Sequence, residues 1–287
     1  MKLTRCKLGK VLELQRGYDL PSSQMEKGDI LVAGSNGVIG YHNEARSNHP
    51  CITVGRSGSV GKVHYYEQAT WAHNTALFVK DFKGNDPKYL YYFLKNLHLD
   101  KMFDKGSSVV PSLDRKVVHS LNVPCHKDID CQKRIAAILS KIDRKIELNR
   151  AINQNLEAMA KQLYDYWFVQ FDFPNEEGKP YKSSGDKMVW NEKLKREIPE
   201  GWDISLIKDI ATTYSGGTPK STNIEYYDNG EIAWINSGEL NSPIITKTTN
   251  YITKCGLENS SAKLYPSNSI LVAMYGATAG KVSLLTF

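Results

Sequence analysis

The residues of this chain best suited to chemistry are two glycine–lysine pairs. Gly61-Lys62 and Gly280-Lys281 invite comparison with a phosphate-binding loop, in which backbone N–H groups and a lysine surround a nucleotide. Valine follows each lysine where that loop requires serine or threonine, and the four-residue glycine spacing is absent. We therefore expect both pairs to lie in strand-like segments and to bind no nucleotide cofactor.

Other catalytic or metal-binding patterns are also missing from the sequence. Cys125, His126 and Cys131 lie close together, but their spacing fits no zinc pattern and no second ligand pair follows. The seven histidines are spread singly, with neither HxH nor HExxH. The Asn/Asp-Pro-Pro-aromatic loop that holds a flipped adenine in methyltransferases is absent, as is a GxGxxG opening a helix. We expect a non-catalytic protein without metal or cofactor.

Three segments instead carry polar side chains beside glycine turns, which suits DNA binding. The candidate contacts are Asn36, His42 and Asn43, then Arg56, Ser57, Ser59 and Lys62, then Ser107, Ser108, Ser112, Arg115 and Lys116. Arg56 is predicted to contact a base edge, because its glycine neighbours leave the backbone flexible. The residues predicted to contact phosphates are Lys62, Arg115 and Lys116. The alternative is that these segments are ordinary turns, the last one capping a short helix.

Charge is distributed unevenly along the chain. Residues 1–127 carry 18 Lys and Arg against 11 Asp and Glu, whereas residues 171–287 carry 12 against 14. The first part therefore has the positive excess that attracts a polyanion. No apolar run approaches the roughly 18 residues of a membrane span, and the N-terminus lacks the apolar core of a signal peptide. We expect a cytoplasmic protein with no membrane partner.

An internal repeat organises the chain. Leu8–Gly17 is echoed by Ile207–Gly216, and Ser57–Val63 is matched by Gly276–Val282. The spacing between the two anchors differs between the copies, so the second copy contains an insertion. Two related domains with divergent interiors are expected.

A long helix is predicted between the copies. Cys131 to Phe168 contains neither proline nor glycine, and its apolar residues recur with a period close to 3.5. At 1.5 Å per residue such a helix is on the order of 55 Å long and needs a partner for its stripe. The residues predicted to pair are Ile135, Ile138, Ile142, Asn149, Ile152, Leu156, Met159 and Leu163. The alternative is a core helix packed on its own domain.

The remaining pattern predicts a mixed α/β first domain, and an α+β fold overall. Asp29–Tyr41 and Ile52–Tyr66 are predicted strand–turn–strand segments, and Asp86-Pro87 is predicted to open a helix to about Phe103. The expected divisions are a first domain over 1–127, a coiled-coil spacer helix over 128–170, a linker over 171–202 and a second domain over 203–287.

Several segments resemble the specificity subunits of type I restriction–modification systems. The matching segments are Gly106–Lys116, Leu121–Pro124, Gln132–Ser140, Lys145–Asn149, Gln162–Phe168 and Ile198–Trp202. The segment 125–130 departs from the family, which has a proline-rich turn and a glutamate before the helix, and so leaves the helix start undefined. The matching segments occur in the order and at the spacing of the family, and the resemblance covers nearly all of the chain.

The resemblance implies a DNA-recognition subunit without catalytic activity. It implies that each target-recognition domain binds one half of a split site in double-stranded DNA, and that paired antiparallel helices set the gap between the halves. It further implies that modification subunits methylate adenine using S-adenosylmethionine and that a restriction subunit cuts using ATP. The alternatives are the recognition part of a fused restriction–modification enzyme, and a coiled-coil scaffold.

The second target-recognition domain is expected to be incomplete. The first copy continues after its matching Val63 with a helix, a loop and the long helix, so on the order of 100 residues would be missing after Val282. We expect residues 1–170 to fold, two copies to pair antiparallel through Ile135–Leu163, and residues 203–287 to be partly disordered. Alternatively, the chain is a silent cassette that recombination completes.

Overall fold

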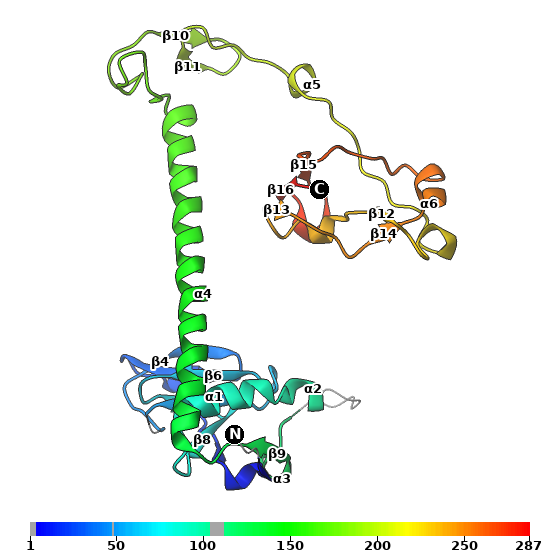
Figure 1. The fold of residues 1–287 in the computed structure, drawn as a ribbon. Helices are drawn as coiled ribbons and strands as arrows, with labels where there is room; N and C mark the ends of the chain where they lie inside the picture. The colour runs from blue at the N-terminus through cyan, green and yellow to red at the C-terminus, as the bar shows by residue number, and fades with distance from the viewer. Residues whose placement is uncertain (1–3, 48, 104–111) are drawn as a thin grey trace. The chain divides into compact units, whose positions relative to one another are not determined.

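The computed structural model describes residues 4–47, 49–103 and 112–287. Its contacts divide the chain into two compact units, Met1–Ser184 and Gly185–Phe287, each of which is described by itself. Both units mix short strands with helices (Figure 1). The predicted α+β fold is confirmed.

Two small sheets form the body of the first unit. The antiparallel four-stranded sheet has the order β2 (Glu13–Arg16), β8 (Ala76–Asp81), β5 (Cys51–Gly55), β6 (Val63–Tyr66). The three-stranded sheet has the order β4 (Gly37–His42), β3 (Ile30–Gly34), β7 (Trp71–Ala72). Strand β1 (Thr4–Lys7) pairs separately with β9 (Asn122–Cys125). The two predicted strand–turn–strand segments are thus β3–β4 and β5–β6.

Short helices complete the first unit. Helix α1 (Pro87–Asn96) begins as predicted, because the Asp86 side chain accepts the backbone N–H of Tyr89 and proline occupies the first turn. It ends earlier than predicted, because His98 takes a left-handed φ of 48° before α2 starts. The others are η1 (Leu8–Lys10), η2 (Ser22–Gln24), α2 (Leu99–Phe103) and α3 (Arg115–Ser120).

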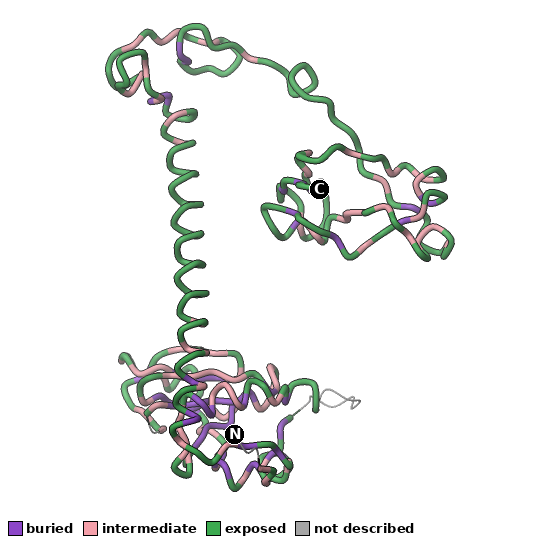
Figure 2. Tube along the Cα trace, in the orientation of Figure 1, coloured by how far each residue is buried: buried purple, intermediate pink, exposed green. Residues whose placement is uncertain are grey.

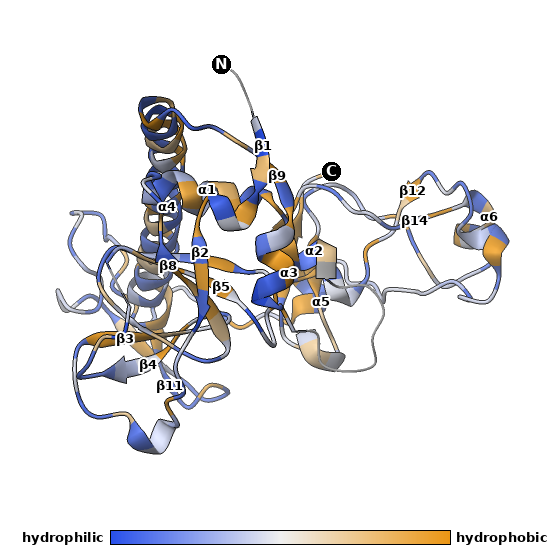
Figure 3. Ribbon diagram, turned by 90° about the horizontal axis from the view of Figure 1, so that it is seen from below, coloured by the Kyte–Doolittle hydropathy of each residue, from blue (hydrophilic) through white to orange (hydrophobic). Residues whose placement is uncertain are grey.

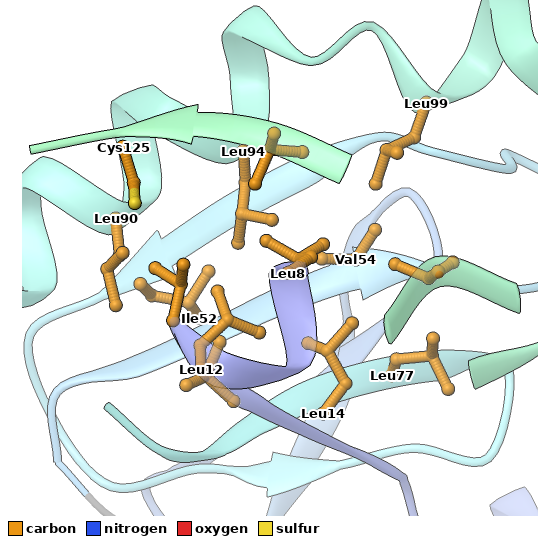
Figure 4. Close-up of a cluster of buried hydrophobic side chains, with 14 of the residues drawn as sticks. Leu8, Leu12, Leu14, Ile52, Val54, Leu77, Leu90, Leu94, Leu99 and Cys125 are labelled. Atoms are coloured by element: carbon orange, nitrogen blue, oxygen red, sulfur yellow. The ribbon is translucent and has the colours of Figure 1, made fainter. Parts of the chain in front are cut away.

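The main hydrophobic core lies between α1, η1 and the four-stranded sheet. Leu90 and Leu94 are fully buried and point from α1 toward Leu12 and Ile52 (Figure 4). Their spacing of four residues places both side chains on one face of the helix. Figure 3 shows the resulting alternation of hydrophobic and hydrophilic segments along α1. This core fixes the sheet whose loops form the candidate site.

Helix α4 (Ile129–Tyr164) is the predicted long helix. It has 36 residues, starts on an Asp128 cap that accepts the N–H groups of residues 130 and 131, and continues into the π-helical turn η3 (Asp165–Val169). Cys131, Gln132 and Ala136 are buried within the first unit. Beyond them the helix is exposed along its length (Figure 2). The predicted uninterrupted helix is confirmed, with its start two residues earlier.

The second unit consists of short elements. A hairpin of β10 (Met188–Asn191) and β11 (Arg196–Pro199) occupies part of the expected linker. The other strands are β12 (Ile232–Ala233), β13 (Ile244–Ile245), β14 (Tyr251–Ile252), β15 (Ile270–Val272) and β16 (Val282–Leu285). The helical turns are α5 (Ile207–Ile210), η4 (Ile224–Tyr226), η5 (Ser237–Glu239), α6 (Lys254–Glu258) and η6 (Gly276–Thr278). Leu240, Ile245 and Ala273 form a small core.

Candidate nucleic-acid interface

Four loops of the first unit converge on one surface, which we call the loop surface. It comprises residues 35–36, 56–62, 73–75 and Ser112. The backbone N–H of Arg56 donates to Thr75 O at 2.8 Å, and Ser57 forms an isolated β-bridge with Ser112. The structure therefore brings together parts of all three predicted segments.

Glycines allow these loops to approach so closely. A Cβ atom on Gly55 would lie 1.9 Å from Ser59 O, and one on Gly61 would lie 2.2 Å from the backbone nitrogen of Asp100. Gly61 also has a φ of 77°, which other residues adopt only with strain. The second predicted segment is thus a tight loop that glycine alone permits, and its polar side chains are displayed at the edge of the sheet.

Arg56 lies half-buried at the base of this surface. Its Nη1 donates to Asn74 O at 3.5 Å, and its own carbonyl accepts from Leu113 N at 2.8 Å. The remaining guanidinium N–H groups are suited to bidentate recognition of a base edge. The role of Arg56 as a base contact therefore stays a prediction.

A turn that the sequence analysis missed lies beside Arg56. His73 Nδ1 and Thr75 Oγ1 are 2.9 Å apart, and the Asn74 amide donates to Asp19. Burial lowers the pKa of His73, although Asp19 opposes this. The signal in the sequence was three consecutive polar residues between two buried strands, without the glycine that marked the other loops.

Lys62 and Asn36 meet at the exposed rim. The Lys62 ammonium donates to Asn36 Oδ1 at 2.7 Å, although 25 residues separate them in sequence. The nearby His64 has a lowered pKa, because burial and then the positive charges of Lys62 and Lys95 disfavour its charged form. His64 is therefore neutral at pH 7 and adds no charge beneath the lysine.

His42 does not belong to the loop surface. Its side chain is 6% exposed, its Nδ1 accepts the backbone N–H of Glu26 at 3.0 Å, and its ring lies edge-on to Trp71. Asn43 is exposed but donates to the Glu26 carboxylate at 2.7 Å, a group that repels phosphate. We therefore remove His42 from the candidate contacts, because its polar atom is already used inside the fold.

The third predicted segment is only partly described. Ser107 and Ser108 lie outside the described residues. Arg115 and Lys116 are exposed at the first turn of α3, where Asp114 Oδ1 accepts the Lys116 N–H at 2.6 Å. That capping contact is the one the alternative interpretation predicted, and it leaves both cationic side chains at the surface.

The predicted pairing residues of α4 form an exposed stripe, apart from the first. Ile135 packs against the core of its own unit. Six apolar members of the set have exposed fractions between 46% and 64%: Ile138, Ile142, Ile152, Leu156, Met159 and Leu163. Asn149 is exposed among them. An apolar stripe of this length in water is typical of a helix that pairs with another helix.

Gln132 joins the long helix to the rest of the first unit, a role that was not predicted from the sequence. Its side chain is 1% exposed. Its Oε1 accepts from Asp86 N at 2.9 Å, and its Nε2 donates to Asn85 Oδ1 and His126 O at 2.7 Å each. The first turn of α4 is thereby fastened to the start of α1.

Two other types of site are not found in the described part of the chain. No three His, Cys, Asp or Glu side chains there are arranged to hold a metal ion. None of its helices is long and apolar enough to cross a membrane.

The fold and this surface define a class: a recognition unit of loops on small sheets, joined through a long exposed helix to a second unit. The chain belongs to the family of type I restriction modification DNA specificity domains, whose model matches residues 3–158 and 199–287. The two matched segments agree with the predicted internal repeat.

Curated relatives are specificity subunits of type I restriction enzymes. The MjaIX subunit of Methanocaldococcus jannaschii is 28% identical over 204 residues, covering 70% of this chain and 45% of the relative. The EcoR124I/EcoR124II subunit of Escherichia coli is 25% identical over 271 residues, covering 88% and 58%. The chain thus spans about half the length of the curated relatives it matches.

A solved structure shares the fold. The crystal structure of a type I restriction–modification system S subunit from M. genitalium matches with a TM-score of 0.53 and 13% identity, covering 99% of this chain and 68% of that one. The expected family is confirmed by sequence, and its architecture by this likeness.

Proposed function

We propose that this chain is the DNA-recognition subunit of a type I restriction–modification complex. The observation that carries the proposal is a recognition unit that leads directly into a 36-residue helix whose apolar stripe is exposed. Each unit would bind one half of a split site in double-stranded DNA. The loop surface would supply Arg56 for a base edge, and Lys62, Arg115 and Lys116 for phosphates.

Helix pairing would set the distance between the two half-sites. Full burial of an exposed leucine, isoleucine or methionine stabilises an interface by about 1.5–3 kcal/mol, and the six apolar members of the stripe are all of these types. Two copies of this chain would pair antiparallel, with Asn149 fixing the register as a polar residue in an apolar seam. Ile135 would contribute little, because its own core already covers it.

Partner subunits would supply the chemistry. Modification subunits would dock on the helices and methylate adenine with S-adenosylmethionine, and a restriction subunit would cleave DNA. This chain would direct both without a catalytic group or cofactor of its own, and would act in the cytoplasm, where it meets chromosomal DNA.

Capture of a random duplex library by the full chain, with the modification subunit present, followed by sequencing, tests this proposal. Enrichment of two short sequences separated by a fixed gap is expected. Recovery of unselected sequence would contradict recognition and favour a scaffold. Sedimentation of the chain alone tests pairing, and a stable monomer at micromolar concentration would count against the homodimer.

A further inference from the structure

The Gly-Lys pair of the first unit closes a defined turn. Strands β5 and β6 pair through Val54 and Val63, and between them Gly55 N donates to Lys62 O at 2.7 Å. Gly61 N donates to Gly55 O at 2.8 Å, with Gly61 at a φ of 77°. Lys62 is exposed at the end of this turn.

The second unit builds the same turn with a loop one residue longer. Strands β15 and β16 pair through Val272 and Val282, and Ala273 N donates to Lys281 O at 2.9 Å. Gly280 N donates to Ala273 O at 2.8 Å, with Gly280 at a φ of 82°. The sequence match between the two copies is therefore a match of backbone hydrogen bonds.

Each lysine also donates a hydrogen bond to the side chain of an asparagine. Lys62 donates to Asn36 Oδ1 at 2.7 Å, and Lys281 donates to Asn241 Oδ1 at 2.5 Å. The two asparagines come from different local structures. Asn36 lies in the β3–β4 turn, whereas Asn241 follows the 3₁₀ turn η5. Two structurally different segments thus supply the asparagine of the same lysine–asparagine pair, at the same type of turn.

We propose that each lysine–asparagine pair is a DNA-phosphate site, which assigns Lys281 and Asn241 as the contact of the second unit. The inference rests on the proposed function and extends it to residues that the sequence left unassigned. It also gives Asn36, predicted only as a DNA contact, the role of positioning a lysine.

The chemistry of the pair suits a phosphate. An ammonium group has three N–H donors, so one bond to asparagine leaves two for phosphate oxygens. The asparagine keeps its own NH₂ group as a further donor beside the charge. All four side chains are exposed, so a DNA backbone has access to them. Holding the lysine in one conformation beforehand also reduces the rotamer freedom lost when phosphate binds.

Salt-dependent binding of the full chain to a fluorescent duplex of mixed sequence, measured by anisotropy, tests this inference. One phosphate contact contributes about 0.9 to the slope of log K against log salt. Lys281→Ala and Lys62→Ala should each reduce the slope by about that amount. If variant and wild type bind equally at 1 M salt, the variant should then bind roughly eightfold more weakly than the wild type at 0.1 M salt. Asn241→Ala keeps the charge, so it should weaken binding by a smaller factor and leave the slope unchanged.

Lys254→Ala is the matched control. It removes a lysine that is 84% exposed in the same unit and lies 3.7 Å from Glu258, and it should change neither slope nor affinity. If the wild-type chain binds duplex but Lys281→Ala keeps its slope, the inference is wrong while the proposed function stands. If Asn241→Ala binds like wild type, asparagine does not position the lysine. If the wild-type chain binds no duplex, the proposed function itself fails.

Discussion

Replacing Gln132 with alanine should loosen the long helix from the recognition unit. The change removes three hydrogen bonds, to Asp86 N, Asn85 Oδ1 and His126 O. Because the Gln132 side chain is 1% exposed, water does not readily replace it. Each buried bond contributes about 1 kcal/mol net, so the unfolding free energy of the first unit should fall by about 3 kcal/mol.

The corresponding fall in melting temperature is about 6–12 °C, since a domain of this size loses about 2–4 °C for each kcal/mol. The assay is urea unfolding of the full chain, with the first unit followed by hydrogen exchange of its own peptides. Gln154→Ala, at an exposed position on the same helix, is the control and should change stability by less than about 0.5 kcal/mol.

Gln132→Met separates the polar contribution from packing, because methionine keeps the volume and removes the hydrogen bonds. It should cost nearly as much as alanine, since the three partly buried partner groups are left unpaired. If both variants unfold at the same urea concentration as wild type, the buried glutamine does not fasten the helix and the reasoning is refuted.

Four further predictions concern single residues. Arg56→Ala should weaken binding to the selected sequence by about 1–3 kcal/mol in a gel-shift competition, leaving unrelated duplex unaffected. Leu156→Glu, which places a carboxylate on the helix seam, should give monomers in sedimentation velocity at unchanged helicity. Burial, and then the nearby Arg115, lower the pKa of His119 from its ordinary 6.5. The contribution of the neutral ring to stability is therefore complete above about pH 6.5 and is lost as the pH falls below it, so His119→Ala should show a smaller decline in stability below about pH 6.5 than the wild type. Burial and a second thiol 2.7 Å away raise the pKa of Cys6 to about 11, so iodoacetamide should modify it far more slowly than the exposed Cys255, as mass spectrometry would show.

Local sequence determined the elements that depend on local interactions. The 3.5-residue period and the absence of proline and glycine specified α4, because helix hydrogen bonds join residues four apart. Asp86 and its following proline specified the start of α1 for the same reason. The duplication of the Gly-Lys pairs was visible in sequence, but their prediction as strand-like segments was wrong. Each pair lies in the turn before its strand, where the glycine takes a left-handed φ.

The tertiary structure decided which polar side chains share a surface. Asn36 meets Lys62, and Arg56 meets the 73–75 turn, through strand pairings that join distant parts of the chain. His42 is of a residue type that often contacts DNA, but its neighbours in the folded chain bury it. Gln132 is of a residue type that is usually exposed on a helix, but here it is buried and its hydrogen bonds hold the helix to the first unit. Residue type and spacing specify local backbone geometry, whereas solvent exposure and polar partners depend on contacts that only the folded chain brings together.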